Sequence, residues 1–134
     1  MPLTYNLAQI EEAAQYILKH SKSKIILFYG DMGAGKTTLI TSLVKALGSE
    51  DKVSSPTFSL VNEYSSPTNS IFHFDFYRID DENEALDIGL EEYLNEDAFI
   101  FIEWPQKIGG FLEENFQKVD IITKDKNLRM LMLS

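Results

Sequence analysis

Two almost wholly apolar stretches and two amphipathic ones stand out when hydrophobic and polar positions are followed along the chain. Residues 24–29 and 98–102 are apolar runs of the kind found in strands that are buried on both faces of a parallel sheet. Apolar residues recur at helical spacing over 6–20, where Leu7 is the first, and over 36–48. The pattern therefore predicts helices that alternate with buried strands.

Further strands are predicted on either side of this alternation. The runs 57–64 and 70–77 are rich in β-branched and aromatic residues, and the short turn-forming cluster between them favours an antiparallel pair. A second hairpin is predicted from 119–123 and 128–133, and 81–95 is predicted to be helical. Together these elements predict an α/β fold whose sheet is mixed rather than purely parallel.

Residues 30–37 match the pattern G-x-x-x-x-G-K-[ST] at every fixed position, between the first apolar run and the second helix. Glycines let successive N–H groups surround a phosphate, and the helix N-terminus adds partial positive charge. Lys36 is expected to reach the β- and γ-phosphates, and the Thr37 hydroxyl to ligate Mg²⁺. The predicted nucleotide-binding residues are Asp31, Met32, Gly33, Ala34, Gly35, Lys36, Thr37 and Thr38.

Hydrolysis also requires an acidic residue beside the metal and a group that orients the attacking water. Glu103 directly follows the apolar run 98–102, which is the pattern of a Walker B element. Asp75 lies on the polar face of the strand at 70–77, opposite an aromatic face. For Glu103 and for Asp75 the alternative interpretation is a surface carboxylate. Trp104 directly follows Glu103, and at this point a packing role is the alternative to a place in the site.

The motif leaves the use of the nucleotide open. Guanine-specific signals are missing from the sequence, so an adenine nucleotide is favoured by elimination. Small-molecule kinases share this loop but usually close an arginine-bearing lid, whereas the only arginines here are Arg78 and Arg129. ATP hydrolysis therefore fits better than phosphoryl transfer to a metabolite, and a nucleotide-gated binding module is a further alternative.

The length and charge of the chain limit the number of domains and the classes of binding partner that can be expected. The 134 residues predict one domain over 1–134. Of 21 acidic side chains nine lie in 80–97, which has no Lys or Arg, so the remaining 12 acidic residues balance the 12 basic ones. No basic stripe is present, and nucleic acid is therefore not expected as a direct ligand. The acidic segment 80–97 is either a solvated helix face or an electrostatic surface for a basic partner.

The cellular setting is also constrained. The chain has no cysteine, which fits a reducing compartment. Its apolar runs are far shorter than the roughly 20 residues of a membrane helix, and its first residues lack the pattern of a signal peptide. A cytoplasmic protein without membrane association is expected.

Four stretches, taken together, resemble the TsaE (YjeE) family of bacterial tRNA threonylcarbamoyladenosine biosynthesis ATPases. They are the loop at 30–38, Ser-Pro-Thr-Phe within 55–64, His-Phe-Asp-Phe-Tyr-Arg at 73–78 and Ile-Glu-Trp-Pro at 102–105. The resemblance implies a three-layer P-loop NTPase-like fold, with a central parallel sheet flanked by antiparallel strands. It also implies an ATPase that uses ATP and Mg²⁺.

The resemblance further implies two partner proteins, TsaD and TsaB. These proteins attach the threonylcarbamoyl group to the adenosine beside the anticodon in tRNAs that read ANN codons. ATP hydrolysis would reset the TsaD–TsaB complex between turnovers, and tRNA would be the substrate of the pathway rather than a ligand of this chain.

Residue roles are carried over by position. Thr57 resembles a switch threonine that senses Mg²⁺ and the γ-phosphate, and Trp104 resembles a tryptophan near the nucleotide. His73 is interpreted as a structural strand residue, with orientation of its neighbours as the alternative. Arg78 is a candidate for contact with a phosphate or a partner, and a salt bridge with the acidic segment is the alternative. The implied catalytic residues are Lys36, Thr57, Asp75 and Glu103, and the implied metal-side residues are Thr37, Thr57 and Glu103.

Overall fold

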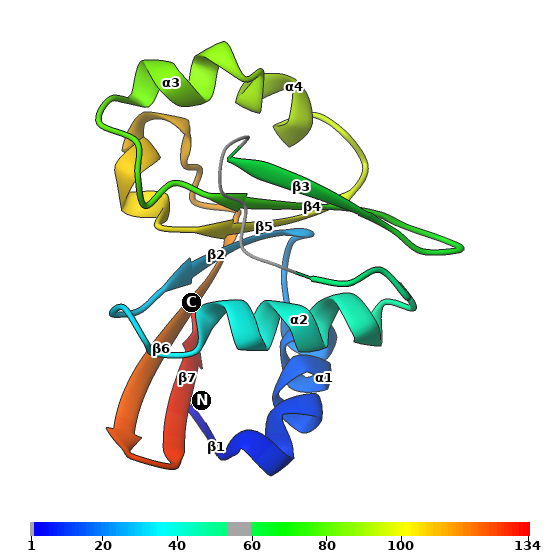
Figure 1. The fold of residues 1–134 in the computed structure, drawn as a ribbon, viewed down its shortest axis with the longest axis vertical. Coiled ribbons are helices and arrows are strands. Elements are labelled where there is room, and N and C mark those ends of the chain that lie inside the picture. The colour runs from blue at the N-terminus through cyan, green and yellow to red at the C-terminus, as the bar shows by residue number, and fades with distance from the viewer. Residues whose placement is uncertain (1, 54–59) are drawn as a thin grey trace.

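The computed structural model describes residues 2–53 and 60–134, and its centre is a seven-stranded sheet (Figure 1). The strand order across the sheet is β1-β7-β6-β2-β5-β4-β3. The strands are β1 (Leu3–Tyr5), β2 (Ile25–Tyr29), β3 (Val61–Ser65), β4 (Ser70–Asp75), β5 (Phe99–Glu103), β6 (Gln117–Asp125) and β7 (Leu128–Leu133). The helices are η1 (Leu7–Gln9), α1 (Ile10–His20), α2 (Lys36–Ala46), α3 (Glu82–Asp87), α4 (Leu90–Leu94) and η2 (Pro105–Phe111).

The middle of the sheet is parallel and its two sides are antiparallel. Strand β2 pairs in parallel with β5 and β6, and β4 pairs in parallel with β5. Strand β3 pairs antiparallel with β4 at one edge, while β6, β7 and β1 form antiparallel pairs at the other. The predicted mixed sheet and both hairpins are confirmed, although residues 57–59 of the predicted strand 57–64 lie outside the described residues.

Helices cover both faces of the sheet (Figure 1). Ile26 and Phe28 of β2 belong to the core cluster that includes residues of α1 and α2. Leu27 belongs to the opposite cluster, with residues of α3, α4 and η2. Because side chains alternate between the two faces of a strand, a central strand between two helical layers must be apolar at every position. The three-layer α/β prediction is confirmed.

The first helical stretch differs from the prediction at its start. Asn6 and Gln9 form a capping box around the short 3-10 turn η1, and the α-helix begins only at Ile10. The helical spacing predicts that Leu7 faces the core, but this residue is 73% exposed. The tighter turn turns Leu7 away from the apolar face that α1 presents to the core.

The stretch 81–95, which was predicted to be helical, contains two short helices rather than one continuous helix. Gly89 has φ +83°, and its N–H bonds the carbonyl of Leu86, so α3 ends and α4 begins there. Strand β1 and helix η2 were not predicted, because three-residue strands and 3-10 turns leave little periodic signal. In the described part of the chain, every helix falls short of the length and apolar character that a membrane crossing requires.

Candidate functional site

Three sequence motifs meet at the carboxyl ends of neighbouring parallel strands. Asp75 at the end of β4 is in register with Glu103 at the end of β5, which is in register with Phe28 of β2. The glycine loop 30–35 leaves the end of β2 and leads into α2. Ligands of open α/β sheets bind at this edge, and the strand register therefore explains why distant motifs come together.

The glycine loop has the backbone conformation that its sequence predicts. Gly33 and Gly35 have φ of +84° and +94°, a region that side chains with a Cβ rarely adopt. Gly35 is the N-cap of α2, and its carbonyl accepts the N–H of Leu39. The first N–H groups of α2 have no helical acceptor, and they give this end of the helix its affinity for anions.

Lys36 lies across the loop rather than in solvent. Its side chain is 5% exposed, its Nζ donates to the carbonyl of Gly30 at 2.6 Å, and the same Nζ lies 3.7 Å from the centre of the Trp104 ring. Burial lowers the pKa of Lys36, and the nearby carboxylates of Glu103, Asp75 and Asp31 oppose that shift. The ammonium group therefore lies beside the loop, and a ligand could replace its contacts with the Gly30 carbonyl and the Trp104 ring.

Trp104 reaches this position through an unusual backbone. Its φ of 57° and ψ of 49° are left-handed, which is strained for a residue with a Cβ. Trp104 connects β5 with η2, and its indole ring faces Lys36 and Tyr77, whose ring centre lies 5.0 Å away. Strain of this kind persists where surrounding contacts fix it, and here it places an aromatic ring against the glycine loop.

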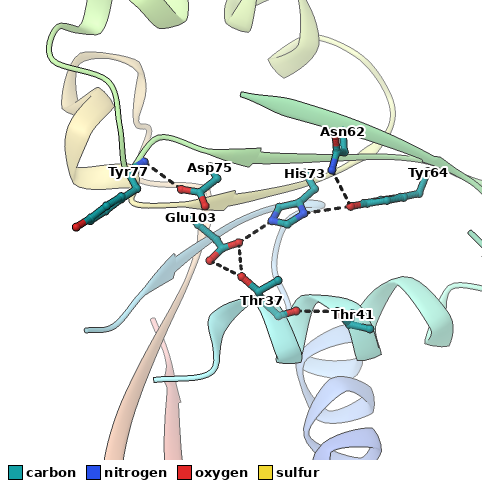
Figure 2. Close-up of polar contacts among 8 residues, drawn as sticks. All are labelled: Thr37, Thr41, Asn62, Tyr64, His73, Asp75, Tyr77 and Glu103. Carbon is teal, nitrogen blue, oxygen red and sulfur yellow. Dashed lines mark hydrogen bonds and ion pairs between the residues drawn. The ribbon is translucent and has the colours of Figure 1, made fainter. Parts of the chain in front are cut away.

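Thr37 and Glu103 form the centre of a buried polar network (Figure 2). The Thr37 hydroxyl lies 3.0 Å from each carboxylate oxygen of Glu103 and donates to this carboxylate. Glu103 is 3% exposed, and its Oε2 lies 2.7 Å from Nε2 of His73, which is fully buried. The sequence interpretation of His73 as structural misses this contact, because a strand pattern does not reveal which ring lies beside which carboxylate.

Asp75 stands next to this network. Its Oδ1 accepts the N–H of Tyr77 at 3.0 Å. Burial raises the pKa of Asp75, and the nearby Glu103 carboxylate adds to this shift, while the Tyr77 N–H, His73 and Lys36 oppose it. A carboxylate whose pKa is raised is better suited to accept a proton than an ordinary aspartate.

These groups share a cavity of about 460 Å³. The predicted site residues that line it are Met32, Gly33, Gly35, Lys36, Thr37, Thr38, Asp75, Glu103 and Trp104. Asp31 and Ala34 line a separate hollow beside Asp120 of β6. Thr57 lies outside the described residues. Arg78 also lines the cavity. Among the described residues, the ion pair between a Lys or Arg and a carboxylate is Lys24–Asp97, so the alternative salt bridge of Arg78 is not formed.

A second hollow of about 430 Å³ adjoins the other side of the glycine loop and shares Gly35 and Thr38 with the first. Arg129 of β7 lies there, and its Nε donates to the carbonyl of Ala34 at 3.1 Å. Sequence reasoning missed the hollow, because its walls come from opposite ends of the chain. Its further lining residues are Tyr5, Asn6, Leu7, Ala8, Ile10, Ala34, Lys126 and Asn127.

The residues present fit a magnesium ion that is shared with a ligand. Within 2–53 and 60–134, no group of three or more His, Cys, Asp or Glu side chains could hold a metal ion by itself. A hydroxyl and a carboxylate that face each other, Thr37 and Glu103, are oxygen donors of the type Mg²⁺ accepts. Mg²⁺ usually takes one or two protein ligands and completes its shell with water and phosphate oxygens.

The strand order and the glycine loop between β2 and α2 place the chain among P-loop NTPase-like α/β proteins. The sequence model of the family described as "Threonylcarbamoyl adenosine biosynthesis protein TsaE" matches residues 4–131. The chain therefore belongs to the TsaE family.

Individual relatives agree with this assignment. The chain is 42% identical over 103 residues to the tRNA threonylcarbamoyladenosine biosynthesis protein TsaE of Haemophilus influenzae, a match that covers 75% of this chain and 65% of that protein. It is 36% identical over 131 residues to the protein of the same name from Aquifex aeolicus, covering 90% of each. The matched region thus spans just under two thirds of the Haemophilus protein.

A solved structure supports the fold. The crystal structure of YdiB from Bacillus subtilis superposes with a TM-score of 0.75, covering 99% of this chain and 84% of that one. The two sequences are 22% identical, so this likeness bears on the fold alone.

Proposed function

We propose that this protein is a Mg²⁺-dependent ATP hydrolase that supports the formation of threonylcarbamoyladenosine in tRNA. Membership of the TsaE family supports the pathway. The observation that carries the reaction is the contact between Thr37 and Glu103 at 3.0 Å, next to the ammonium of Lys36. A phosphate-loop hydroxyl paired with a strand-end carboxylate is the arrangement that P-loop enzymes use beside a nucleotide-bound metal ion.

Phosphate binding follows from the loop and α2. The N–H groups at the start of α2 and in the glycine loop are donors for phosphate oxygens. Lys36 exchanges its bond to the Gly30 carbonyl for the β- and γ-phosphate oxygens, with which an ammonium pairs more strongly. Because the pKa of Lys36 is lowered only by desolvation, the arriving phosphate charge restores its preference for the charged form.

Thr37 and Glu103 form the metal side of the site. Mg²⁺, when bound, neutralises charge that develops on the phosphate oxygens. The Thr37 hydroxyl donates a hydrogen bond to the Glu103 carboxylate, and in this orientation its oxygen would be a ligand of the ion. Glu103 keeps further lone pairs for a water molecule of the ion's shell.

Asp75 activates the attacking water. It lines the same cavity as Lys36 and Thr37, and its raised pKa suits a general base. The water oxygen forms a bond to the γ-phosphorus, the bond to the β–γ bridging oxygen breaks, and Asp75 takes the proton. The products are ADP and inorganic phosphate, and Lys36 stabilises the charge that develops on the transferred group.

The second hollow receives the nucleoside. It shares Gly35 and Thr38 with the phosphate cavity, so one molecule can occupy both. Binding of ATP and GTP, measured by competition, tests the adenine assignment that the sequence supports only by elimination. A preference for ATP is expected, and equal affinity would contradict the assignment.

The partner proteins proposed from the family are TsaD and TsaB. The test is ATP turnover by this protein alone and with the TsaD–TsaB pair of the same organism. Turnover is expected to rise when the pair is added and to disappear when Mg²⁺ is chelated. A pair that neither binds the ATP-loaded protein nor changes its turnover would contradict the proposal.

Resetting of the complex by hydrolysis has a separate test. The Glu103→Ala protein should support one round of tRNA modification, because binding alone suffices, and should fail in later rounds. Full support of many rounds by Glu103→Ala would show that binding of the nucleotide, rather than its hydrolysis, serves the pathway. The alternative of a nucleotide-gated binding module would then replace this part of the proposal.

A further inference from the structure

His73 is a polar side chain buried on the strand next to the edge of the sheet, and the mechanism above gives it no role. It belongs to β4, and its exposed fraction is 0%. A buried imidazole is costly unless both ring nitrogens have hydrogen-bond partners. Figure 2 shows that both nitrogens face polar groups, the Glu103 carboxylate on one side and the Tyr64 hydroxyl on the other.

The contacts of His73 have a definite direction. The Glu103 carboxylate can only accept, so Nε2 of His73 donates to it over 2.7 Å. In the neutral ring Nδ1 is then an acceptor, and the Tyr64 hydroxyl, 3.4 Å away, is the donor. The Asn62 amide donates in turn to the Tyr64 oxygen at 3.3 Å. Asn62 and Tyr64 belong to the edge strand β3, so a chain of donors runs from the sheet edge to Glu103.

The orientation of Glu103 determines what Thr37 can do. Thr37 lies 3.0 Å from both carboxylate oxygens, so its proton points at Glu103 and its lone pairs point elsewhere. If the carboxylate rotated, the hydroxyl would follow it and its lone pairs would turn away from an arriving ion. The short contact from His73 fixes one oxygen of Glu103 and thereby opposes this rotation.

We propose that His73 is a positioning residue for the magnesium side of the site: it holds Glu103 in the rotamer in which Glu103 orients the Thr37 hydroxyl. This inference rests on the proposed nucleotide and Mg²⁺ site. The group responsible is the Nε2–H donor of His73. Its loss is expected to weaken the effect of Mg²⁺ on nucleotide binding.

Calorimetric titration with ADP, in the presence and absence of Mg²⁺, separates this role from a packing role. The quantity of interest is the factor by which Mg²⁺ tightens ADP binding. In His73→Leu this factor is expected to fall about 10-fold, the lower end of the effect of residues that orient metal ligands. Without Mg²⁺ the affinity for ADP should stay within about twofold, because the ring nitrogens of His73 bond Glu103 and Tyr64 rather than the glycine loop that binds phosphate.

Two further variants control for loss of packing. His73→Gln keeps an N–H donor near the Nε2 position, and it is expected to retain the Mg²⁺ factor within about threefold. Phe72→Leu alters the adjacent position of β4, whose side chain enters the opposite core cluster. It is expected to lower stability and leave the Mg²⁺ factor unchanged.

The outcomes distinguish this inference from the function on which it rests. A wild-type protein that binds no ADP would overturn the proposed function and the inference with it. Wild-type binding with an unchanged Mg²⁺ factor in His73→Leu would overturn the inference alone. If His73→Leu does not fold, the ¹H–¹⁵N spectrum of the wild-type imidazole decides: a proton on Nε2 supports the inference, and Nε2 without a proton overturns it.

Discussion

The cavity at the glycine loop and the acidic segment 80–97 carry charge in opposite ways. In the cavity two opposite charges are sheltered: Lys36 is 5% exposed and Glu103 is 3% exposed. In the acidic segment nine carboxylates follow one another without a Lys or Arg, and all of them are exposed. The comparison teaches that burial, rather than the number of charges, decides where charged groups are fixed tightly enough for chemistry.

The acidic segment nevertheless contains ordered carboxylates. Asp81 accepts the N–H of Asn83, and Glu84 accepts the N–H of Asp81, which forms the capping box of α3. Glu82 accepts the N–H of Gly110 at 2.7 Å and so ties α3 to η2. These carboxylates stabilise local structure, whereas Glu91 and Glu92 in the first turn of α4 lie in solvent.

The largest effect is expected from Lys36→Met, which removes the cation of the cavity and keeps an apolar stem of similar length. Loss of one charge-stabilising group in a transition state lowers turnover by about 100-fold to 1,000-fold. The measurement is phosphate release at saturating ATP and partner proteins. Lys45→Met, near the exposed end of the same helix, is the matched control and should behave as wild type.

Asp75→Asn is expected to lower turnover by about 100-fold, the lower end of the contribution of a general base. Because burial raises the pKa of Asp75, wild-type turnover should fall on acidification at a higher pH than an ordinary aspartate would produce. Asp75→Asn should lose this part of the pH profile. An identical profile in the variant would exclude Asp75 as the base, and Asp120→Asn serves as the control carboxylate.

Asp75 is expected to affect stability and turnover in opposite directions as the pH changes: turnover falls on acidification, whereas stability falls as the pH rises. The folded state holds this proton more tightly than the unfolded state, so the free energy of unfolding should decrease as pH rises from the unfolded pKa through the raised one. Denaturant unfolding of wild type and Asp75→Asn across this window checks the sign. A wild-type stability that rises relative to the variant would contradict the burial argument.

A smaller effect is expected from Asp81→Ala in the acidic segment. Loss of an N-cap side chain costs about 1 kcal/mol of unfolding free energy. Turnover at saturating partner should not change, because the cavity contains no residue of α3. Asp87→Ala, at the C-terminal end of the same helix, is the control and should not destabilise the protein.

The smallest effect is expected from the double variant Glu91→Gln and Glu92→Gln. Both side chains are exposed, so stability should change by less than about 0.5 kcal/mol. Association with the TsaD–TsaB pair should slow by about two- to threefold at low salt, and this difference should vanish at high salt. Association that responds to neither salt nor substitution would leave the segment a solvated helix face.

Sequence predicted the parts of the site that local patterns define. The glycine loop, Lys36 and Thr37 follow from one contiguous motif, and Glu103 follows from a strand that ends in an acid. The contact of His73 with Glu103 and that of Arg129 with Ala34 join residues 30 and 95 positions apart, and they depend on strand register and hairpin placement. The spacing of residues along the sequence reveals neither contact. The second hollow was missed for the same reason.

We expect the cavity to determine turnover and the acidic segment to affect only association with the partners. The most direct test of this difference is phosphate release measured as a function of TsaD–TsaB concentration. Three proteins are compared: wild type, Asp75→Asn and the Glu91→Gln, Glu92→Gln double variant. We predict that Asp75→Asn loses the plateau rate, whereas the double variant keeps the plateau and reaches it at a higher partner concentration. A wild-type plateau in Asp75→Asn, or a lost plateau in the double variant, would contradict the account.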